Sequence, residues 1–215
     1  MSVLVQCGLY LVTDSRLSLG RDLVEVVRES VKGGVDIVQL REKNISTREF
    51  IVLAKRMKAM LTLYKVPLII NDRVDVALAS GADGVHLGQS DMPYAEARAL
   101  LDADKIIGLS VESMAQVKEA EGLDLDYIAL SPIFSTPTKT DTVTEWGIES
   151  LKEVRKISRH PIVAIGSLNK GNIPAVIEAG ADIIAVVSAI CSADSPFEAA
   201  RELKATIVKS KENRV

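Results

Sequence analysis

The chain has 215 residues, of which 47% are hydrophobic, 26% are charged and only 4% are aromatic. This composition is typical of a globular protein, and a net charge of -3 leaves no overall positive field that could hold nucleic acid. No apolar run approaches the roughly 20 residues that a membrane span requires. Cys7 and Cys191 form no CxxC pair, so we expect a cytoplasmic protein without disulfides.

Eight short apolar runs, rich in β-branched residues, recur along the chain. They predict strands at Gly8–Thr13, Asp36–Leu40, Pro67–Asn71, Gly84–Leu87, Lys105–Leu109, Tyr127–Leu130, Pro161–Ile165 and Ile183–Val187. Apolar residues spaced three or four apart predict helices between the strands. The clearest of these helices are Leu23–Val31, Thr47–Leu63 and Met114–Glu121.

The regular alternation of strand and helix favours a single (βα)8 TIM barrel domain over residues 1–215. The strands are nearly continuous apolar runs, as expected for parallel strands that helices cover. Three stretches resemble each other, GGVDIV, GADGVHL and GADIIAV, and no linker interrupts the repeats. An open Rossmann-like sheet is the alternative, but no GxGxxG motif follows a strand.

In such a barrel the active site lies at the carboxyl ends of the strands, so the polar residues there are candidates. After the second strand, Gln39, Arg41 and Lys43 share one face because side chains alternate along a strand. Two cations and an amide suit a phosphorylated substrate. The alternative is that Arg41 and Lys43 are surface charges.

Two acidic residues follow the next two strands, Asp72 in the Asn71-Asp72 pair and Asp91 a little beyond Leu87. Each could cap the helix that follows it. Two carboxylates on adjacent strand ends also suit Mg²⁺, which takes one or two protein carboxylates and completes its shell with water and phosphate oxygens. The residues alone leave both interpretations open.

The remaining strand ends offer small and hydroxyl residues. Ser110 could place a hydroxyl near a phosphate, and the long polar loop from Ser131 to Thr142 is either a binding lid or a surface loop. Gly166-Ser167 and Val187-Ser188 end the last two strands, where barrels commonly bind phosphate through backbone N–H groups. We interpret His86 as a core histidine, with a position at the mouth of the barrel as the alternative, and His160 as structural.

These motifs together resemble those of the thiamin phosphate synthases over essentially the whole chain. The matching stretches are LYLVTD (Leu9–Asp14), QLREK (Gln39–Lys43), NDRVDVA (Asn71–Ala77), GVHLGQSD (Gly84–Asp91), SPIFSTPTKTD (Ser131–Asp141) and Gly180–Ser188. The resemblance implies a transferase that condenses hydroxymethylpyrimidine diphosphate with hydroxyethylthiazole phosphate and releases diphosphate. It implies Mg²⁺ as cofactor and small molecules as partners, without nucleic acid or membrane. It does not fix the oligomeric state.

The resemblance also implies a role for each matched position. The metal ligands are Asp72 and Asp91. The pyrimidine diphosphate contacts are Gln39, Arg41, Lys43, Asn71, Ser110 and Lys139, and the catalytic residues among them are Arg41, Lys43, Ser110 and Lys139. The thiazole phosphate contacts are Thr136, Thr138, Gly166, Ser167, Val187 and Ser188.

Two positions depart from the family pattern. The family usually has a second glycine where this chain has Ser167, which places the thiazole phosphate half of the site in doubt. Many relatives have a histidine where this chain has Glu112. A thiazole tautomerase, an isomerase on the same barrel that in the family depends on that histidine, and a non-catalytic regulatory paralogue are the alternative functions.

Overall fold

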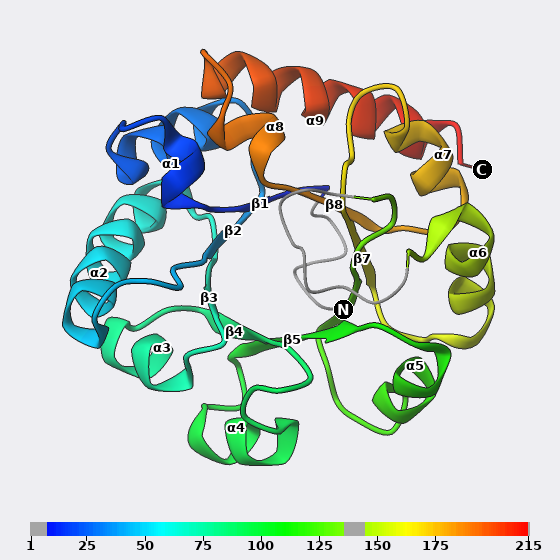
Figure 1. Cartoon of the computed structure of the whole chain (residues 1–215), viewed down its shortest axis with the longest axis horizontal. Coiled ribbons are helices and arrows are strands. Elements are labelled where there is room, and N and C mark those ends of the chain that lie inside the picture. Colours follow the sequence, from blue (N-terminus) through cyan, green and yellow to red (C-terminus); the bar gives the residue numbers. More distant parts are fainter. Residues whose placement is uncertain (1–7, 136–144, 215) are drawn as a thin grey trace.

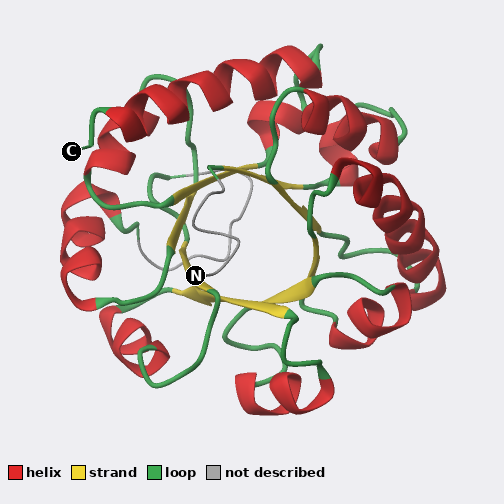
Figure 2. Ribbon diagram, turned by 180° about the vertical axis from the view of Figure 1, so that it is seen from behind, coloured by secondary structure: helices red, strands yellow, loops and turns green. Residues whose placement is uncertain are grey.

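The chain forms a closed barrel of eight parallel strands in the order β1 to β8, and β8 pairs back with β1. The structure is a computed structural model, which describes residues 8–135 and 145–214. The helices surround the strands as an outer layer (Figures 1 and 2). The sequence-based prediction of a TIM barrel is therefore confirmed.

The strands lie close to their predicted positions. They are β1 Leu9–Val12, β2 Ile37–Leu40, β3 Leu68–Asn71, β4 Gly84–Leu87, β5 Ile106–Val111, β6 Tyr127–Leu130, β7 Ile162–Ile165 and β8 Ile183–Val186. β4 and β6 have the predicted bounds, and the ends of the others differ by one or two residues.

Helices follow the strands within the described residues. They are the 3-10 helix η2 Ser15–Ser18, then α1 Leu23–Lys32, α2 Thr47–Tyr64, α3 Val74–Ser80, α4 Tyr94–Leu100, α5 Met114–Ala120, α6 Gly147–Ile157, α7 Ile173–Glu178, α8 Ser188–Cys191 and α9 Pro196–Glu212. Gly81 ends α3 at φ 70°, a left-handed conformation that glycine adopts without steric cost.

Side chains alternate between the inside of the barrel and the layer beneath the helices. Val38 and Leu40 of β2 belong to the outer core, which packs under the helices, whereas Gln39 between them lines the central cavity. A second buried cluster fills the interior of the barrel. Its members are Tyr10, Val12, Ile37, Ile69, Tyr127, Ala129, Val163, Ile183 and Ala185.

One aspartate stands directly before each even-numbered strand and binds the strand that precedes it. We call these four residues, Asp36, Asp83, Asp126 and Asp182, the aspartate clamps. Their Oδ2 atoms accept backbone N–H groups of β1, β3, β5 and β7, from Leu9 (2.8 Å), Leu68 (2.7 Å), Ile107 (2.9 Å) and Ile162 (2.8 Å). Each carboxylate also faces a cation, namely Lys204, Lys58, Arg98 or Arg155. The clamps explain the aspartates in the three similar sequence stretches.

Contacts between the two ends of the chain close the barrel. Tyr10 of β1 is in register with Ala185 of β8. Lys204 of α9 pairs with Asp36 at 2.6 Å. The Arg21 guanidinium donates to the carbonyl oxygen of Cys191 at the end of α8, at 2.7 Å. The segment from β1 to the start of β2 is therefore fastened to β8, α8 and α9.

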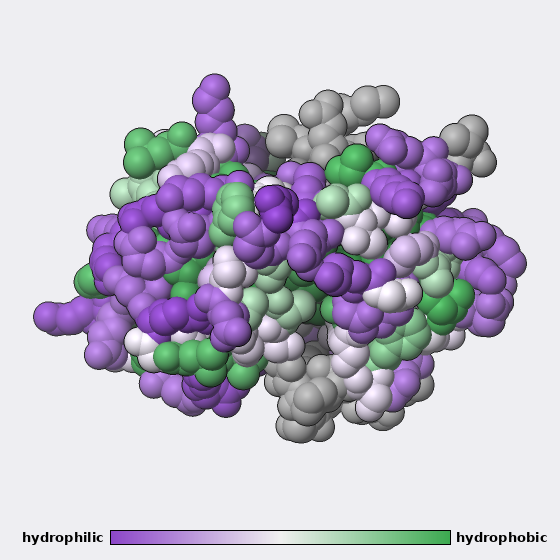
Figure 3. All heavy atoms as spheres, turned by 90° about the horizontal axis from the view of Figure 1, so that it is seen from above, coloured by the Kyte–Doolittle hydropathy of each residue, from purple (hydrophilic) through white to green (hydrophobic). Residues whose placement is uncertain are grey.

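The outer surface in side view is covered mostly by hydrophilic side chains, with hydrophobic ones in small separate areas (Figure 3). Across residues 8–135 and 145–214, no helix combines the length and the apolar composition that crossing a membrane would require.

Candidate active site

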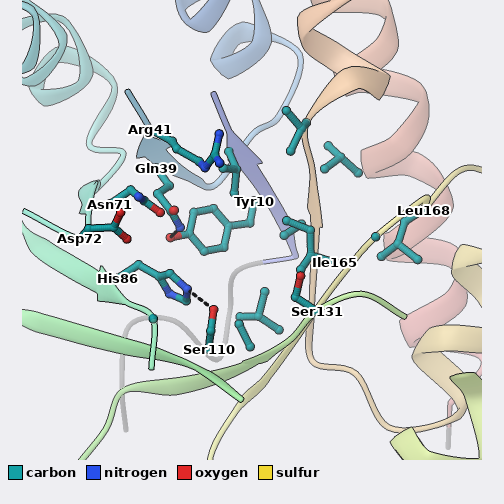
Figure 4. Close-up of a pocket in the computed structure, with 18 of the residues that line it drawn as sticks. Tyr10, Gln39, Arg41, Asn71, Asp72, His86, Ser110, Ser131, Ile165 and Leu168 are labelled. Atoms are coloured by element: carbon teal, nitrogen blue, oxygen red, sulfur yellow. Dashed lines mark hydrogen bonds between the residues drawn. The ribbon is translucent and has the colours of Figure 1, made fainter. Parts of the chain in front are cut away.

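A cavity of about 450 Å³ opens at the carboxyl ends of the strands, and residues on or just after all eight strands line it (Figure 4). The predicted site residues that the structure describes all lie in this lining. They are Gln39, Arg41, Lys43, Asn71, Asp72, Asp91, Ser110, Gly166, Ser167, Val187 and Ser188. Glu112 lines the cavity as well. Thr136, Thr138 and Lys139 lie outside the described residues.

Arg41 is held at the cavity by residues that follow β1. Its backbone N–H donates to the Thr13 hydroxyl oxygen at 3.1 Å, and its guanidinium lies 3.7 Å from the Asp14 carboxylate. The Asp14 side chain is only 4% exposed, and the hydrogen bond from Arg16 lowers its pKa, so the carboxylate is charged. The Arg41 side chain is 25% exposed and lines the cavity, so Arg41 is not merely a surface charge.

Asp72 and Asp91 approach each other across the loops after β3 and β4. Burial raises the pKa of Asp91, and the carboxyl of Asp72 raises it further by hydrogen bonding and charge. Lys43 forms an ion pair with Asp72, and the Gly88 N–H donates to Asp91 at 2.6 Å. Two carboxylates thus share one polar region with Lys43 beside them.

Neither carboxylate caps a helix. The residue before α3 is Arg73 and the residue before α4 is Pro93, and no side chain forms a capping hydrogen bond at either end. Asp72 also has φ 62°, a left-handed conformation that is uncommon outside glycine. The capping alternative is therefore wrong, and the local structure directs both acids to the cavity.

The donor set fits a hard divalent cation that brings other ligands with it. Within the described ranges, no group of three or more His, Cys, Asp or Glu side chains could hold a metal by itself. Mg²⁺ commonly uses one or two protein carboxylates and fills its remaining positions with water and phosphate oxygens. A cation between Asp72 and Asp91 would also relieve the repulsion that raises the pKa of Asp91.

The opposite side of the cavity is built from β7, β8 and the residues after them. Gly166 has φ 115°, and a Cβ there would lie 2.6 Å from the Pro132 Cβ, so this position requires glycine. Ser167 has φ 52°, and its hydroxyl donates to the Ser135 carbonyl oxygen. The lining residues on this side are uncharged, namely Val163, Ile165, Gly166, Ser167, Leu168, Ala185, Val186, Val187, Ser188 and Ala189.

The sequence interpretation missed two residues in the floor of the cavity, Tyr10 and Tyr127, and it considered a third, His86, only as an alternative. His86 is buried, as expected for a core histidine, but it also lines the cavity and binds the Ser110 hydroxyl at 2.8 Å (Figure 4). The alternation of side chains along a strand points Tyr10 and His86 into the barrel, and this pattern could have identified them from the sequence. His160 binds the carbonyl oxygens of Leu125 and Ala120 outside the cavity, as expected for a structural residue.

Comparison with known proteins places this geometry in a family. Residues 9–190 match the family model described as thiamine monophosphate synthase. The chain is 55% identical over 195 residues to the thiamine-phosphate synthase of Vibrio parahaemolyticus, covering 91% of this chain and 95% of that protein. It is 52% identical over 199 residues to the thiamine-phosphate synthase of Albidiferax ferrireducens, covering 93% and 91%.

A solved structure agrees with these relatives. The thiamine phosphate pyrophosphorylase from Pyrococcus furiosus superposes with a TM-score of 0.87 at 38% identity, covering 95% of this chain and 96% of that chain. The function predicted from the sequence motifs is therefore confirmed at the level of the family. The chain belongs to the thiamine-phosphate synthase family of enzymes.

Proposed function

We propose that the chain joins hydroxymethylpyrimidine diphosphate to hydroxyethylthiazole phosphate within the cavity, and that it releases diphosphate. The observation that supports this most directly is the division of the cavity into two unlike halves. Cations and paired carboxylates line the half formed by β2 to β4, while the residues from β7 and β8 are uncharged. A diphosphate with its metal suits the first half, and a second substrate that binds through backbone N–H groups suits the other.

On the charged half, Asp72 and Asp91 would hold Mg²⁺, whose chemistry when bound is to neutralise charge on the departing diphosphate. Arg41, Lys43 and Lys139 add positive charge for the same leaving group, and Arg41 can bind two oxygens at once through its fork. Lys43 can exchange its contact with Asp72 for a phosphate oxygen. The Ser110 hydroxyl donates to the same group.

Gln39 and Asn71 contact the pyrimidine ring, since their amides offer both donors and acceptors at the buried end of the charged half. Backbone N–H groups near Gly166, Ser167, Val187 and Ser188 bind the thiazole phosphate. Thr136 and Thr138 complete the same half-site in this proposal.

The reaction needs no protein nucleophile. The C–O bond to diphosphate breaks with both electrons leaving on oxygen, and the electron-rich aminopyrimidine stabilises the resulting cation. The lone pair of the thiazole nitrogen then forms the new C–N bond. Cys191 is not a candidate nucleophile, because its side chain is buried and does not line the cavity, and because burial raises its thiol pKa to about 11. The chain holds the reactants close and stabilises the leaving charge.

The experiment is Mg²⁺-dependent release of diphosphate from the two substrates, measured for the parent and for Asp72→Ala and Asp91→Ala. Both variants should lose orders of magnitude in turnover while remaining folded. Asp75→Ala is the matched control, because Asp75 is exposed on α3 and pairs with Arg73 away from the cavity. Full activity of both variants in excess EDTA contradicts the metal site. Thiazole isomerisation without diphosphate release would indicate a tautomerase, and binding without turnover a regulator.

The cytoplasmic location and the single domain over residues 1–215 stay predictions from the sequence. They are consistent with a small-molecule enzyme whose barrel is complete within one chain.

A further inference from the structure

A continuous chain of hydrogen bonds runs beneath the cavity and joins side chains from five strands. Gln39 Nε2 donates to the Tyr10 hydroxyl at 2.9 Å, and the Tyr10 and Tyr127 hydroxyls lie 2.9 Å apart. The Tyr127 hydroxyl lies 3.0 Å from His86 Nδ1, and His86 Nε2 lies 2.8 Å from the Ser110 hydroxyl. Gln39 and Ser110, the two ends of the chain, are both proposed substrate contacts.

Once Gln39 donates, one direction of the chain leaves no buried hydroxyl hydrogen unpaired. Among the described residues, the Tyr10 hydroxyl has only Gln39 and Tyr127 as hydrogen-bond partners, so a Tyr10 that accepts from Gln39 finds an acceptor for its own hydrogen only at Tyr127. Tyr127 then gives its hydrogen to His86 Nδ1. The histidine hydrogen then lies on Nε2 and is donated to Ser110. Ser110 keeps its own hydrogen for an acceptor in the cavity. At the other end, the Gln39 side-chain oxygen has no donor among the described residues.

The surroundings keep this chain rigid. Tyr10 and Tyr127 are at most 1% exposed, and their rings meet edge to face with centroids 6.0 Å apart. The His86 ring stacks on Tyr127 at 5.6 Å. A Cβ at Gly108 would lie 2.0 Å from the Tyr127 ring, so a glycine on β5 makes the space for the phenol. The rings therefore have little room to turn.

Packing alone does not require these hydroxyls. Buried polar groups must be paired to offset their lost hydration, and two phenylalanines would fill the same volume without that cost. A fully paired buried network does fix a unique arrangement of its members. The arrangement fixed here is a hydrogen-bond acceptor at Gln39 and a hydrogen-bond donor at Ser110, on opposite sides of the charged half of the cavity.

We propose that Tyr10, Tyr127 and His86 are positioning residues that set which atoms Gln39 and Ser110 present to the pyrimidine diphosphate. The inference rests on the proposed function. The Gln39 oxygen accepts from the amino group of the pyrimidine, and the Ser110 hydroxyl donates to a phosphate oxygen. The chain thereby selects an aminopyrimidine over a ring with oxygen in place of the amino nitrogen, because two acceptors would then face each other.

The first test is the tautomer of His86 in the substrate-free protein, measured by long-range proton–nitrogen NMR correlation. His160→Gln identifies the signals, since the chain has only 2 histidines. The expected result is hydrogen on Nε2 with Nδ1 bare. Hydrogen on Nδ1 overturns the proposal, because the chain would then run in the opposite direction. This measurement needs no catalytic activity, so its failure is distinct from failure of the proposed function.

The second test compares kcat/KM for the amino substrate and for its oxo analogue. In Tyr10→Phe the Gln39 amide can turn and offer its NH₂ group, so the preference for the amino substrate should fall by about tenfold, the equivalent of one hydrogen bond. Tyr127→Phe should raise the KM for the pyrimidine diphosphate and leave the KM for the thiazole phosphate unchanged. Tyr94→Phe is the matched control, because that hydroxyl bonds the Asp124 carbonyl oxygen outside the cavity.

A purely structural role would lower the melting temperature of Tyr10→Phe and leave its substrate preference at the parent value. That result in a folded variant refutes the positioning role. If the parent itself released no diphosphate, the proposed function would fail instead.

Discussion

The aspartate clamps allow a graded prediction of stability, because the four carboxylates have different bonds. Asp36 accepts two backbone N–H groups, from Gly8 at 2.7 Å and Leu9 at 2.8 Å, and pairs with Lys204 at 2.6 Å. Asp126 accepts one, from Ile107 at 2.9 Å, and its arginine partner Arg98 is 3.9 Å away. Replacing each aspartate with asparagine keeps an oxygen acceptor and removes the charge.

Asp36→Asn should lower the free energy of unfolding by about 2–3 kcal/mol. A hydrogen bond to a charged group contributes about 1 kcal/mol more than a neutral one, and this variant weakens two such bonds and leaves Lys204 without its counter-charge. For a chain of 215 residues this corresponds to a melting temperature lower by about 4–12 °C.

Asp126→Asn should behave differently, because burial raises the pKa of Asp126 despite the Ile107 bond and the Arg98 charge. A raised pKa in the folded state means that the stability contributed by Asp126 is present below the unfolded pKa, near 3.8, and is lost as the pH rises through the folded pKa. Asparagine avoids this loss. We expect Asp126→Asn to change stability by less than about 1 kcal/mol at neutral pH and to gain on the parent as the pH rises above 3.8 through the folded pKa.

Thermal and urea unfolding, followed by circular dichroism, measure both effects. Asp104→Asn serves as the control because Asp104 is exposed on the loop between α4 and β5. Equal losses for Asp36→Asn and Asp126→Asn would refute the reasoning from bond number and burial. So would an Asp126→Asn variant that loses stability relative to the parent as the pH rises.

Three further predictions concern the site. Because the pKa of Asp91 is raised, a proton competes with Mg²⁺ for this carboxylate. Calorimetry should therefore show that the affinity for Mg²⁺ falls, and that more protons are released on binding, as the pH is lowered toward that pKa. An affinity that does not depend on pH contradicts this prediction. Arg41→Lys should lower kcat/KM by an amount that corresponds to about 1–3 kcal/mol of activation free energy, because lysine cannot bind two phosphate oxygens as the arginine fork does. Unchanged kinetics would show that Arg41 makes no such contact. Ser167→Gly should lower the KM for thiazole phosphate by up to about tenfold and leave the KM for the pyrimidine diphosphate unchanged. The reason is that Ser167 has φ 52°, which favours glycine, and that its hydroxyl already donates to the Ser135 carbonyl oxygen. A raised KM for thiazole phosphate would show that the serine assists binding.

The strands and the mouth of the cavity could be predicted from the sequence because each depends on local pattern. Parallel strands covered on both sides are continuous apolar runs, and the residues just after them lie at one end of the barrel. Gln39 and Arg41 follow from side-chain alternation alone, continued from β2 into the residue after it. The carboxylates Asp72 and Asp91 needed the structure, because only the backbone around Arg73 and Pro93 shows that they do not cap helices.

The hydrogen-bond chain could not be predicted in the same way. Tyr10 and Tyr127 are 117 positions apart and come from strands that are not neighbours in the barrel. Their contact across the interior depends on the stagger of all the strands and on the space left by Gly108. The Ser167 hydroxyl is a similar case, since its rotamer follows from the position of the Ser135 carbonyl rather than from any sequence motif.

The joining of the two chain ends affects how the protein is made on the ribosome. β1 is synthesised before the other seven strands, but its partner β8 comes after all of them, and the Asp36–Lys204 pair joins residues 168 positions apart. At a synthesis rate of about 5–20 residues per second, the edge of β1 stays unpaired for on the order of ten to thirty seconds before β8 is made. A chain that terminates before Ile183 keeps the edge open permanently. Chains that terminate shortly before β8 should therefore aggregate or be degraded, because an unpaired strand edge can pair with other chains.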